Sequence, residues 1–316
     1  MRHSTGMPAG HRLTLMTVHG HPDDETVHTG GIMARYAAEG LRVICVVATR
    51  GEVGEIIDPA RDTAENRERL GSIREAELRA AVAALAPAGG IEIELLGYRD
   101  SGTMGRPENG DPRAFWQADE DEAVARLVEL IQATEADVIV SPNQFGTDGH
   151  PDHMKAAAVA RAAYLRAGGQ DTPDGRPAGA ASWRPSKLYE SVTDTSSRRA
   201  KLRQLLRTRP WPDVIRSGWR YVRTWRPSHE RHRARVAGAR GEVTTRVDIR
   251  PFVAAKLAAM RAHATQIDPA GDLFALSPQA RATVTPTEDF TLAASRLPVT
   301  IPEDDLFAGL RPVDGR

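Results

Sequence analysis

Short apolar stretches alternate with amphipathic stretches through the first 190 residues of this 316-residue chain. The apolar stretches are rich in β-branched side chains, which predicts buried strands. Between them, apolar side chains recur at helical spacing, as at Leu70, Ile73, Ala80 and Ala84. The predicted strands span residues 13–18, 41–49, 91–95, 137–140 and 187–192, and the predicted helices span residues 26–39, 63–85, 119–133 and 151–166.

The alternation of strands and helices predicts a parallel sheet that is covered by helices on both faces. We therefore predict a doubly wound, Rossmann-like α/β fold, with its core in residues 13–192. Ligands of such sheets bind beyond the carboxyl ends of the strands, where the strand order reverses. In the common order 3-2-1-4-5, strands one and four are neighbours that flank this crevice. Side chains that follow these two strands are therefore expected to meet.

The rest of the chain is predicted to extend the same domain, which would span residues 1–316. Residues 195–241 form a basic, Trp-containing insertion, and residues 242–316 form a C-terminal extension that begins with a strand-like stretch. Within the insertion, residues 213–226 can form a basic amphipathic helix of the kind that contacts anionic membranes. Two other interpretations remain open: the segment packs on the body of the protein or over the cleft, or it binds an anionic or lipid-linked substrate.

Composition excludes several classes of protein. The 42 Lys and Arg residues balance the 42 Asp and Glu residues, so no overall charge favours nucleic acid, and we expect no nucleic-acid partner. The single cysteine, Cys45, allows neither an intrachain disulfide nor a cysteine-rich zinc site. No signal peptide and no membrane-spanning stretch is recognisable, so we expect a cytoplasmic protein. The sequence does not indicate an oligomeric state.

Two clusters of histidines and carboxylates carry the candidate chemistry. The first is His21-Pro22-Asp23-Asp24-Glu25, after the first predicted strand, and the second is His150-Pro151-Asp152-His153, after the fourth. His21 and Asp24 can face one point from a short loop, and His153 can supply a third ligand. Catalytic zinc typically has three protein ligands and one open position for water. The same donors would also bind Fe²⁺, so we predict Zn²⁺ with Fe²⁺ as the alternative.

The remaining residues of the two clusters fit acid–base roles. Asp23 is the predicted general base for the water. If it is cationic in the complex, His150 is predicted to hydrogen-bond the developing oxyanion or to protonate the leaving group. Asp152 is predicted to orient His150. The alternative is that both clusters merely begin helices and carry solvated charges.

These motifs resemble those of the LmbE-like (PIG-L type) N-deacetylase family. The resemblance covers most of the chain outside the basic segment. The matching residues are His19 to Glu25, Gly30-Gly31, Thr49 to Glu52, Ile73 to Leu78, Arg99 to Gly102, Gly149 to His153, Ala262 to Gln266 and Glu303 to Phe307. Members of this family are metal-dependent enzymes that remove acyl groups from amino sugars.

The resemblance implies a role for each residue. His21, Asp24 and His153 would bind zinc, Asp23 would be the base, and His150 would assist the tetrahedral intermediate. Arg74 and Asp100 match the sugar-binding positions of family members that act on N-acetylglucosaminyl-inositol in mycothiol synthesis. Asp148 departs from the pattern, because those members carry a tyrosine two residues before the second cluster. The departure bears on the substrate more than on the reaction.

The sequence thus predicts a zinc-dependent hydrolase that removes an N-acetyl group from an amino-sugar conjugate such as N-acetylglucosaminyl-inositol. An amidase that cleaves a thiol conjugate of a similar sugar is the alternative within the same chemistry. A peripheral protein that binds anionic lipid through residues 213–226 is the alternative from another class. The sequence names neither the sugar nor the acyl group.

Overall fold

The computed structural model describes residues 10–169, 183–192, 242–269, 274, 278, 281–282 and 285–311. Seven strands form one sheet in the order β3-β2-β1-β4-β5-β7-β6. The predicted order of the first five strands is therefore confirmed. These are β1 (Thr14–His19), β2 (Arg42–Thr49), β3 (Ile91–Tyr98), β4 (Val138–Ser141) and β5 (Lys187–Val192), and they pair in parallel.

The C-terminal extension continues this sheet. After β5, the strands β7 (Thr287–Ser295) and β6 (Thr245–Asp248) add on as antiparallel neighbours. The sheet is therefore mixed, whereas the sequence predicted only parallel strands. The strand predicted over 242–248 corresponds to β6, but β7 had no counterpart among the predicted elements. Only Glu288 and Phe290 of β7 are fully buried, so its apolar pattern is weak.

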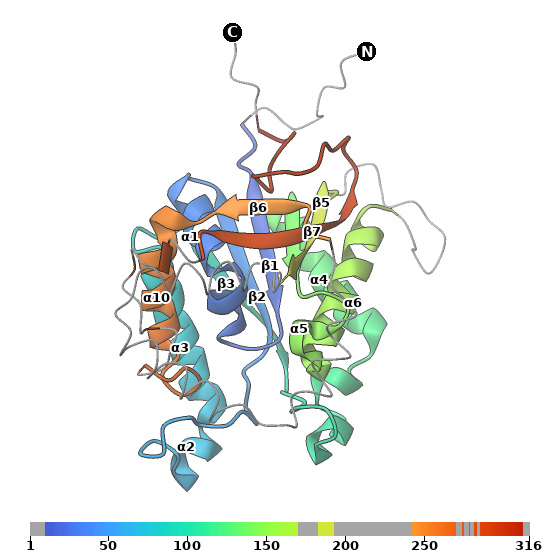
Figure 1. Ribbon diagram of the computed structural model, residues 1–316. Coiled ribbons are helices and arrows are strands. Elements are labelled where there is room, and N and C mark those ends of the chain that lie inside the picture. Colours follow the sequence, from blue (N-terminus) through green and yellow to red (C-terminus); the bar gives the residue numbers. More distant parts are fainter. Residues whose placement is uncertain are drawn as a thin grey trace.

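Helices cover both faces of the sheet (Figure 1). One face carries α1 (Gly30–Ala38), α3 (Leu70–Leu85) and α10 (Val253–Ala262), and the other carries α4 (Glu120–Thr134) and α6 (Pro151–Ala167). Each face has its own hydrophobic core. Leu15, Val43 and Leu78 belong to the first core, and Met16, Ile44 and Leu127 belong to the second. Neighbouring residues of β1 and β2 thus point to opposite faces, as the pleat requires.

Two predicted helices are interrupted in the structure. The helix predicted over 26–39 begins with a π-helical turn, η1 (Glu25–Thr29), before α1. Such turns are frequent at functional sites. The helix predicted over 63–85 divides at Arg69 into α2 (Ala64–Glu68) and α3. The short elements are η2 (Pro107–Gly110), η3 (Phe115–Gln117), α5 (Gly146–Gly149) and η4 (Arg250–Phe252).

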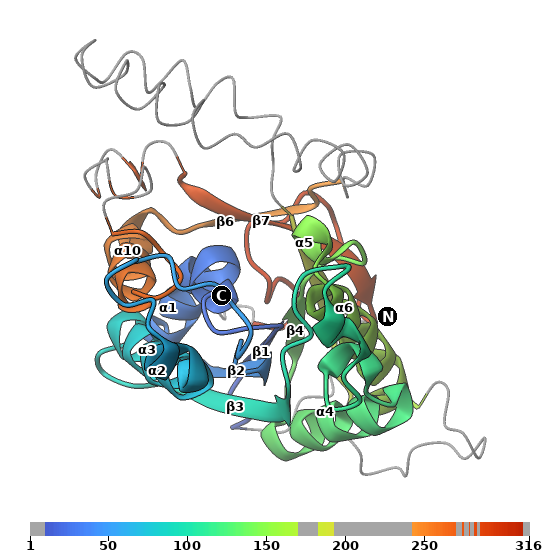
Figure 2. The same ribbon diagram turned by 90° about the horizontal axis from the view of Figure 1, so that it is seen from below.

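The central strands direct both histidine clusters to one edge. All six residues of β1 are buried, as are all four of β4, and the two strands pair directly, with Leu15 opposite Val138. Figure 2 shows the molecule from the edge at which these two strands end. The loops that follow β1 and β4 therefore emerge side by side. Among the described helices, none combines the length and hydrophobicity that crossing a bilayer requires.

Candidate metal centre and active site

Three side chains from the two clusters converge at the carboxyl edge of the sheet. The Nδ1 atom of His21 lies 3.1 Å from Nε2 of His153. The Oδ2 atom of Asp24 lies 3.1 Å from the same His153 nitrogen and 3.7 Å from His21 Nδ1. All three residues are buried. The structure thus brings together the three predicted metal ligands, although they lie about 130 residues apart in sequence.

The spacing of these three atoms fits a single metal ion. Ligand atoms at about 2.0–2.2 Å from a tetrahedral zinc ion lie roughly 3.4 Å from one another. The observed separations of 3.1, 3.1 and 3.7 Å bracket that value. Two imidazoles and one carboxylate also match the donor set of catalytic zinc sites. The residues present therefore fit a divalent cation that has an open position.

His150 offers an alternative third ligand. Nitrogen atoms of His21, His150 and His153 lie within 4.8 Å of one another. However, the Nδ1 atom of His150 accepts a hydrogen bond from the backbone N–H of Asp152, 3.2 Å away, at the start of α6. This bond occupies the Nδ1 atom of His150 at the helix start. Because Asp24 directs an oxygen to both ligand histidines, we favour the set that contains Asp24.

Gly20 makes the close approach of the two clusters possible. A Cβ atom at Gly20 would lie 2.6 Å from Cδ2 of His153, closer than real contacts allow. Glycine at the end of β1 therefore lets the imidazole from α6 pack directly against the backbone of the first cluster. Glycine between His19 and His21 thus leaves the space that His153, from the other cluster, occupies.

The carboxylate of Asp152, which the sequence predicted to orient His150, lies closer to His21 than to His150. Its Oδ2 atom lies 3.0 Å from Nε2 of His21, but 4.0 Å from Nδ1 of His150. Ser101 donates to the same carboxylate twice, from its backbone N–H at 2.9 Å and from its hydroxyl. Asp152 is fully buried and bridges the histidine of one cluster to the loop after β3. A metal-binding histidine usually donates its second N–H to such a carboxylate.

The environment of His150 favours its neutral form. Burial, together with the neighbouring His21 and His153, lowers the pKa of His150 to about 4. Because Nδ1 accepts the Asp152 N–H, the proton of the neutral ring resides on Nε2. The ring is packed edge-on against His21, with 4.5 Å between their centroids. His150 can therefore present an N–H donor at the edge of the cluster.

Asp23 has an unusual backbone and a perturbed carboxyl group. Its φ of +112° is rare for a residue with a side chain. Burial and the Asp24 carboxylate raise the pKa of Asp23 to about 6, although the Arg74 guanidinium opposes this rise. The side chain is 25% exposed, whereas that of Asp24 is 11% exposed. Asp23 thus combines access to solvent with a pKa suited to a general base.

Arg74 supports the loop that carries Asp23. It extends from α3 and donates to the backbone oxygens of Pro22, at 2.5 Å, and of Gly51, at 3.0 Å. Its Nη2 atom also lies 3.5 Å from Oδ1 of Asp23. A Cβ atom at Gly51, whose φ is +65°, would lie 2.0 Å from this guanidinium. Arg74 is buried, and its described contacts are with the protein, so its contact with substrate stays a prediction.

Asp100 lies against His21. Its Oδ1 atom is 3.5 Å from His21 Nε2 and accepts the Gly102 N–H at 2.7 Å. Its Oδ2 atom accepts the Val53 N–H at 3.3 Å. Burial alone would raise the pKa of Asp100, but His21 and the Gly102 N–H hold it well below its usual range. The predicted role of Asp100 in sugar binding likewise stays a prediction.

The carboxylates around His21 together favour the protonated form of its imidazole ring. Burial alone would lower the pKa of His21, yet Asp100 and Asp152 raise it to about 10. The site therefore has an excess of negative charge that a proton partly compensates. A cluster of this sign attracts a cation.

Sequence reasoning missed one pair of residues beside the site. Glu25 accepts the Asp23 N–H at 2.8 Å through Oε2, and its Oε1 lies 2.7 Å from Nε2 of His263. Both side chains are completely buried. His263 is the C-cap residue that directly follows α10, in the C-terminal extension. In the sequence, His263 was marked only by its place in the motif Ala262 to Gln266, and that motif did not indicate Glu25 as its partner.

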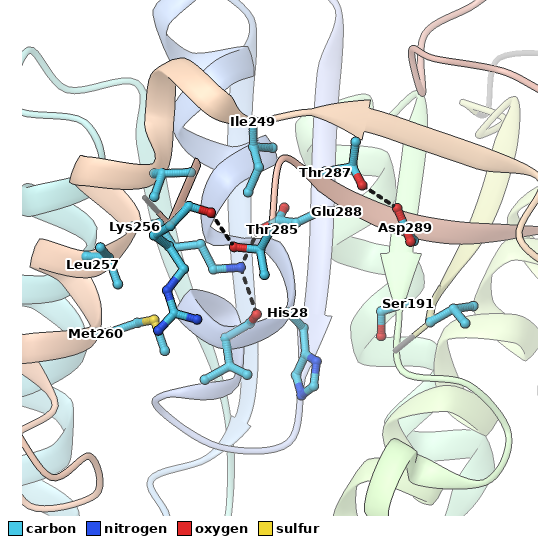
Figure 3. A pocket seen from close by; sticks show the side chains of 14 residues that line it. His28, Ser191, Ile249, Lys256, Leu257, Met260, Thr285, Thr287, Glu288 and Asp289 are labelled. Carbon is cyan, nitrogen blue, oxygen red and sulfur yellow. Dashed lines mark hydrogen bonds and ion pairs between the residues drawn. The ribbon is translucent and has the colours of Figure 1, made fainter. Parts of the chain in front are cut away.

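A separate cavity of about 330 Å³ lies beside η1 and contains none of the predicted metal ligands. Lys256, Leu257 and Met260 of α10 line one side, and Ser191 and Asp289 line the other (Figure 3). Two of its charged groups have partners within the protein. Lys256 pairs with Glu288 at 2.6 Å, and Glu288 accepts the N–H groups of Gly31 and Ile32 at the start of α1. This contact fastens β7 of the extension to α1.

Two predictions concern parts outside the described residues. The basic insertion, with its amphipathic helix over 213–226, lies in the range 193–241, which the structure does not describe. Asp148 belongs to α5, but its side chain is also outside the described set. The structure therefore leaves both of these predictions as they stand.

Comparison with known proteins identifies relatives along nearly the whole chain. A family model described as "PIG-L: GlcNAc-PI de-N-acetylase" matches residues 16–164. A 1D-myo-inositol 2-acetamido-2-deoxy-alpha-D-glucopyranoside deacetylase of Nocardiopsis dassonvillei is 42% identical over 312 residues. That match covers 93% of this chain and 100% of the relative.

Solved structures share the fold at lower sequence identity. An N,N'-diacetylchitobiose deacetylase of Pyrococcus horikoshii superposes with a TM-score of 0.55 at 18% identity, over 88% of this chain and 83% of the other. A 4-carboxy-2-hydroxymuconate hydratase of Pseudomonas putida superposes with a TM-score of 0.54 at 18% identity, over 91% and 98%. Because a deacetylase and a hydratase share this fold, the fold alone does not determine the reaction.

Proposed function

Because the chain belongs to the PIG-L family of GlcNAc-PI de-N-acetylases, we propose that it is a zinc-dependent hydrolase that removes the N-acetyl group from N-acetylglucosaminyl-inositol. The single observation that carries the proposal is the convergence of His21 Nδ1, Asp24 Oδ2 and His153 Nε2. Asp23, the proposed base, directly precedes Asp24 in the chain. The substrate follows from the relative that is 42% identical over 93% of this chain.

The proposed reaction assigns one task to each residue. A divalent cation held by His21, Asp24 and His153 would supply a polarised water and an electrophile for the amide carbonyl. Asp23 takes a proton from the attacking water, and then delivers a proton to the departing sugar nitrogen. His150 donates its Nε2 proton as a hydrogen bond to the carbonyl oxygen as negative charge develops there.

Residues around the ligands keep this arrangement in place. Asp152 accepts a hydrogen bond from Nε2 of His21 and so directs its Nδ1 towards Asp24 and His153. Arg74 fixes the backbone of the first loop at Pro22. Because Arg74 and Asp100 flank this loop, we propose that their remaining hydrogen-bonding capacity meets hydroxyl groups of the sugar. Zn²⁺ is the proposed metal, and Fe²⁺ would accept the same donors.

The decisive experiment combines metal reconstitution with a set of substrates. Protein stripped with a chelator is supplied with Zn²⁺ or Fe²⁺, and acetate release is measured from N-acetylglucosaminyl-inositol. Asp24→Ala should abolish both metal retention and activity, whereas Asp121→Asn, on the surface of α4, should retain both. Acetate release that survives complete metal removal would contradict the proposal.

The same assay separates the alternative functions. A thiol conjugate of the amino sugar serves as the substrate for the amidase alternative. Faster cleavage of the conjugate than of the N-acetyl sugar would favour the amidase. Sedimentation with anionic liposomes tests membrane contact through 213–226. Its loss in a variant without those basic residues, at unchanged deacetylation, would assign that segment to the membrane. We also propose a cytoplasmic location, which fractionation of cells checks.

A further inference from the structure

The backbone of Asp23 needs external support. A φ of +112° is sparsely populated for a residue with a side chain and persists only where the surroundings enforce it. The carbonyl oxygen of Asp23 accepts the N–H groups of Thr26 and Val27, both at 3.1 Å, which closes the turn into η1. The N–H group of Asp23 points the other way, to Oε2 of Glu25 at 2.8 Å. Glu25 therefore holds the backbone on one side of the proposed base.

Glu25 can hold this position only if its charge is compensated. Its side chain has no exposed surface, and a buried carboxylate without a partner is strongly disfavoured. The partner is His263, whose Nε2 atom lies 2.7 Å from Oε1 of Glu25 and which is equally buried. The two carboxylate oxygens of Glu25 are thus divided between the Asp23 N–H and the His263 ring.

His263 itself is held by the extension. It is the C-cap residue that directly follows α10, and its carbonyl oxygen accepts the N–H groups of Gln266 and Ile267, at 3.0 and 2.8 Å. The helix α10 lies beside α3, from which Arg74 reaches the same loop (Figures 1 and 2). Asp23 is therefore supported from the core by Arg74 and from the C-terminal extension by His263. The support from His263 passes through Glu25, 238 positions earlier in the chain.

We propose that His263 is a positioning residue for the amide hydrolysis, acting through Glu25 on the backbone of Asp23. This inference rests on the proposed function, in which Asp23 is the base. It makes the C-terminal extension a part of the active site, although His263 contacts none of the metal ligands in the described structure. Without the imidazole of His263, the Glu25 carboxylate is no longer held in position. The backbone of Asp23 then loses its support, and the Asp23 carboxylate is no longer oriented for catalysis.

The first test compares two variants with the unaltered protein, all with 316 residues and loaded with zinc. His263→Ala should lower kcat by about 100-fold, the effect of a small misplacement of a catalytic group. Zinc content and KM should stay within about twofold, because ligands and sugar contacts are untouched. His263→Gln places an amide N–H near Glu25 and should recover at least about tenfold of the loss.

The matched control lies two residues further along. The hydroxyl of Thr265 donates to Glu77 at 2.7 Å, a buried contact in the same segment that does not reach Asp23. Thr265→Val should therefore retain the wild-type kcat, although it should lower the thermal stability about as much as His263→Ala does. Equal losses of kcat in Thr265→Val and His263→Ala would overturn the proposal, because both would then reflect general loosening.

A double-mutant cycle identifies the path of the effect. Asp23→Asn removes the base, so addition of His263→Ala should cause no further loss of kcat. A further loss as large as that of His263→Ala alone would overturn the proposal. Retention of wild-type kcat by His263→Ala would also overturn it.

A crystal structure of the His263→Ala protein separates this inference from the proposed function. If the wild-type protein releases no acetate with any metal, the proposed function fails while the structural test still decides the positioning. Loss of the hydrogen bond between Glu25 and the Asp23 N–H supports the inference. Retention of that bond, with φ of Asp23 still near its wild-type value, overturns it.

Discussion

Asp152 and His21 form a 3.0 Å hydrogen bond between Oδ2 and Nε2, on the side of the imidazole opposite Asp24 and His153. The bond joins the two sequence clusters directly. It also sets the orientation of the His21 ring, because the nitrogen that remains, Nδ1, then faces the other two proposed ligands. The second cluster thus supplies one proposed ligand, His153, and fixes the orientation of another, His21, from the first cluster.

Substitution of Asp152 should therefore weaken metal binding. In Asp152→Ala, His21 loses its acceptor and Ser101 loses the carboxylate to which it donates twice. Loss of such a partner typically costs about 10–100-fold in metal affinity. Competition with a chromophoric chelator measures the dissociation constant for Zn²⁺. Asp121→Asn, which removes only a surface ion pair with Arg166, is the control. Unchanged zinc affinity in Asp152→Ala would contradict this role.

Gly20→Ala should damage the site through sterics alone. The added Cβ would lie 2.6 Å from Cδ2 of His153, so the imidazole must move away from the other two ligand atoms. We expect zinc affinity and kcat/KM to fall by at least about tenfold, since ligand placement tolerates only small errors. Gly110→Ala, where a Cβ meets nothing within 4 Å, should leave both unchanged. Normal zinc affinity in Gly20→Ala would show that His153 is not a ligand.

Arg74 should set the acid limb of the pH–rate profile. Burial raises the pKa of Asp23 to about 6, and the Arg74 guanidinium opposes that rise. A general base must be deprotonated, so kcat/KM increases as pH rises through the pKa of Asp23. Arg74→Gln removes the opposing cation and should move this limb to higher pH, whereas Arg74→Lys keeps the charge and should move it less. A limb that moves to lower pH in Arg74→Gln would exclude Asp23 as the base.

The parts of the fold that could be predicted depend on local pattern and general topology. Strand β2 falls within the predicted range 41–49, because a long, nearly all-apolar run that is rich in β-branched residues is typical of a buried strand. Once strands one and four are neighbours, the two clusters must meet, and the structure brings them together. The proposed ligand set rests on residue type and spacing.

The remainder depends on contacts between distant residues. Strand β7 is recognisable mainly by its pairing with β5 and β6, since few of its residues are fully buried. The partner of Asp152 could not be deduced either, because His21 and His150 are equally plausible until the loop after β3 is placed. The Glu25–His263 pair joins residues 238 positions apart, and nothing in either local motif predicts the other.

The extension and the core should unfold together, because a buried ion pair joins them. Lys187 of β5 lies 2.6 Å from Glu303, and both side chains are almost completely buried. Tyr189 donates to the same carboxylate at 2.6 Å. Removal of one partner from such a pair leaves an uncompensated charge, so Lys187→Met should reduce the free energy of unfolding by about 3–5 kcal/mol.

Chemical denaturation followed by circular dichroism and by tryptophan fluorescence measures this loss. Arg113→Ala, at an exposed pair with Asp111, should cause no measurable change. If residues 1–316 form a single domain, both probes should report one transition with the same midpoint in the wild-type protein. Combination of Lys187→Met with Glu303→Gln should recover most of the loss, because the charge that the first substitution leaves buried is then removed. Two separate transitions, with Lys187→Met affecting only one, would instead show that the extension folds independently of the sheet that carries the metal ligands.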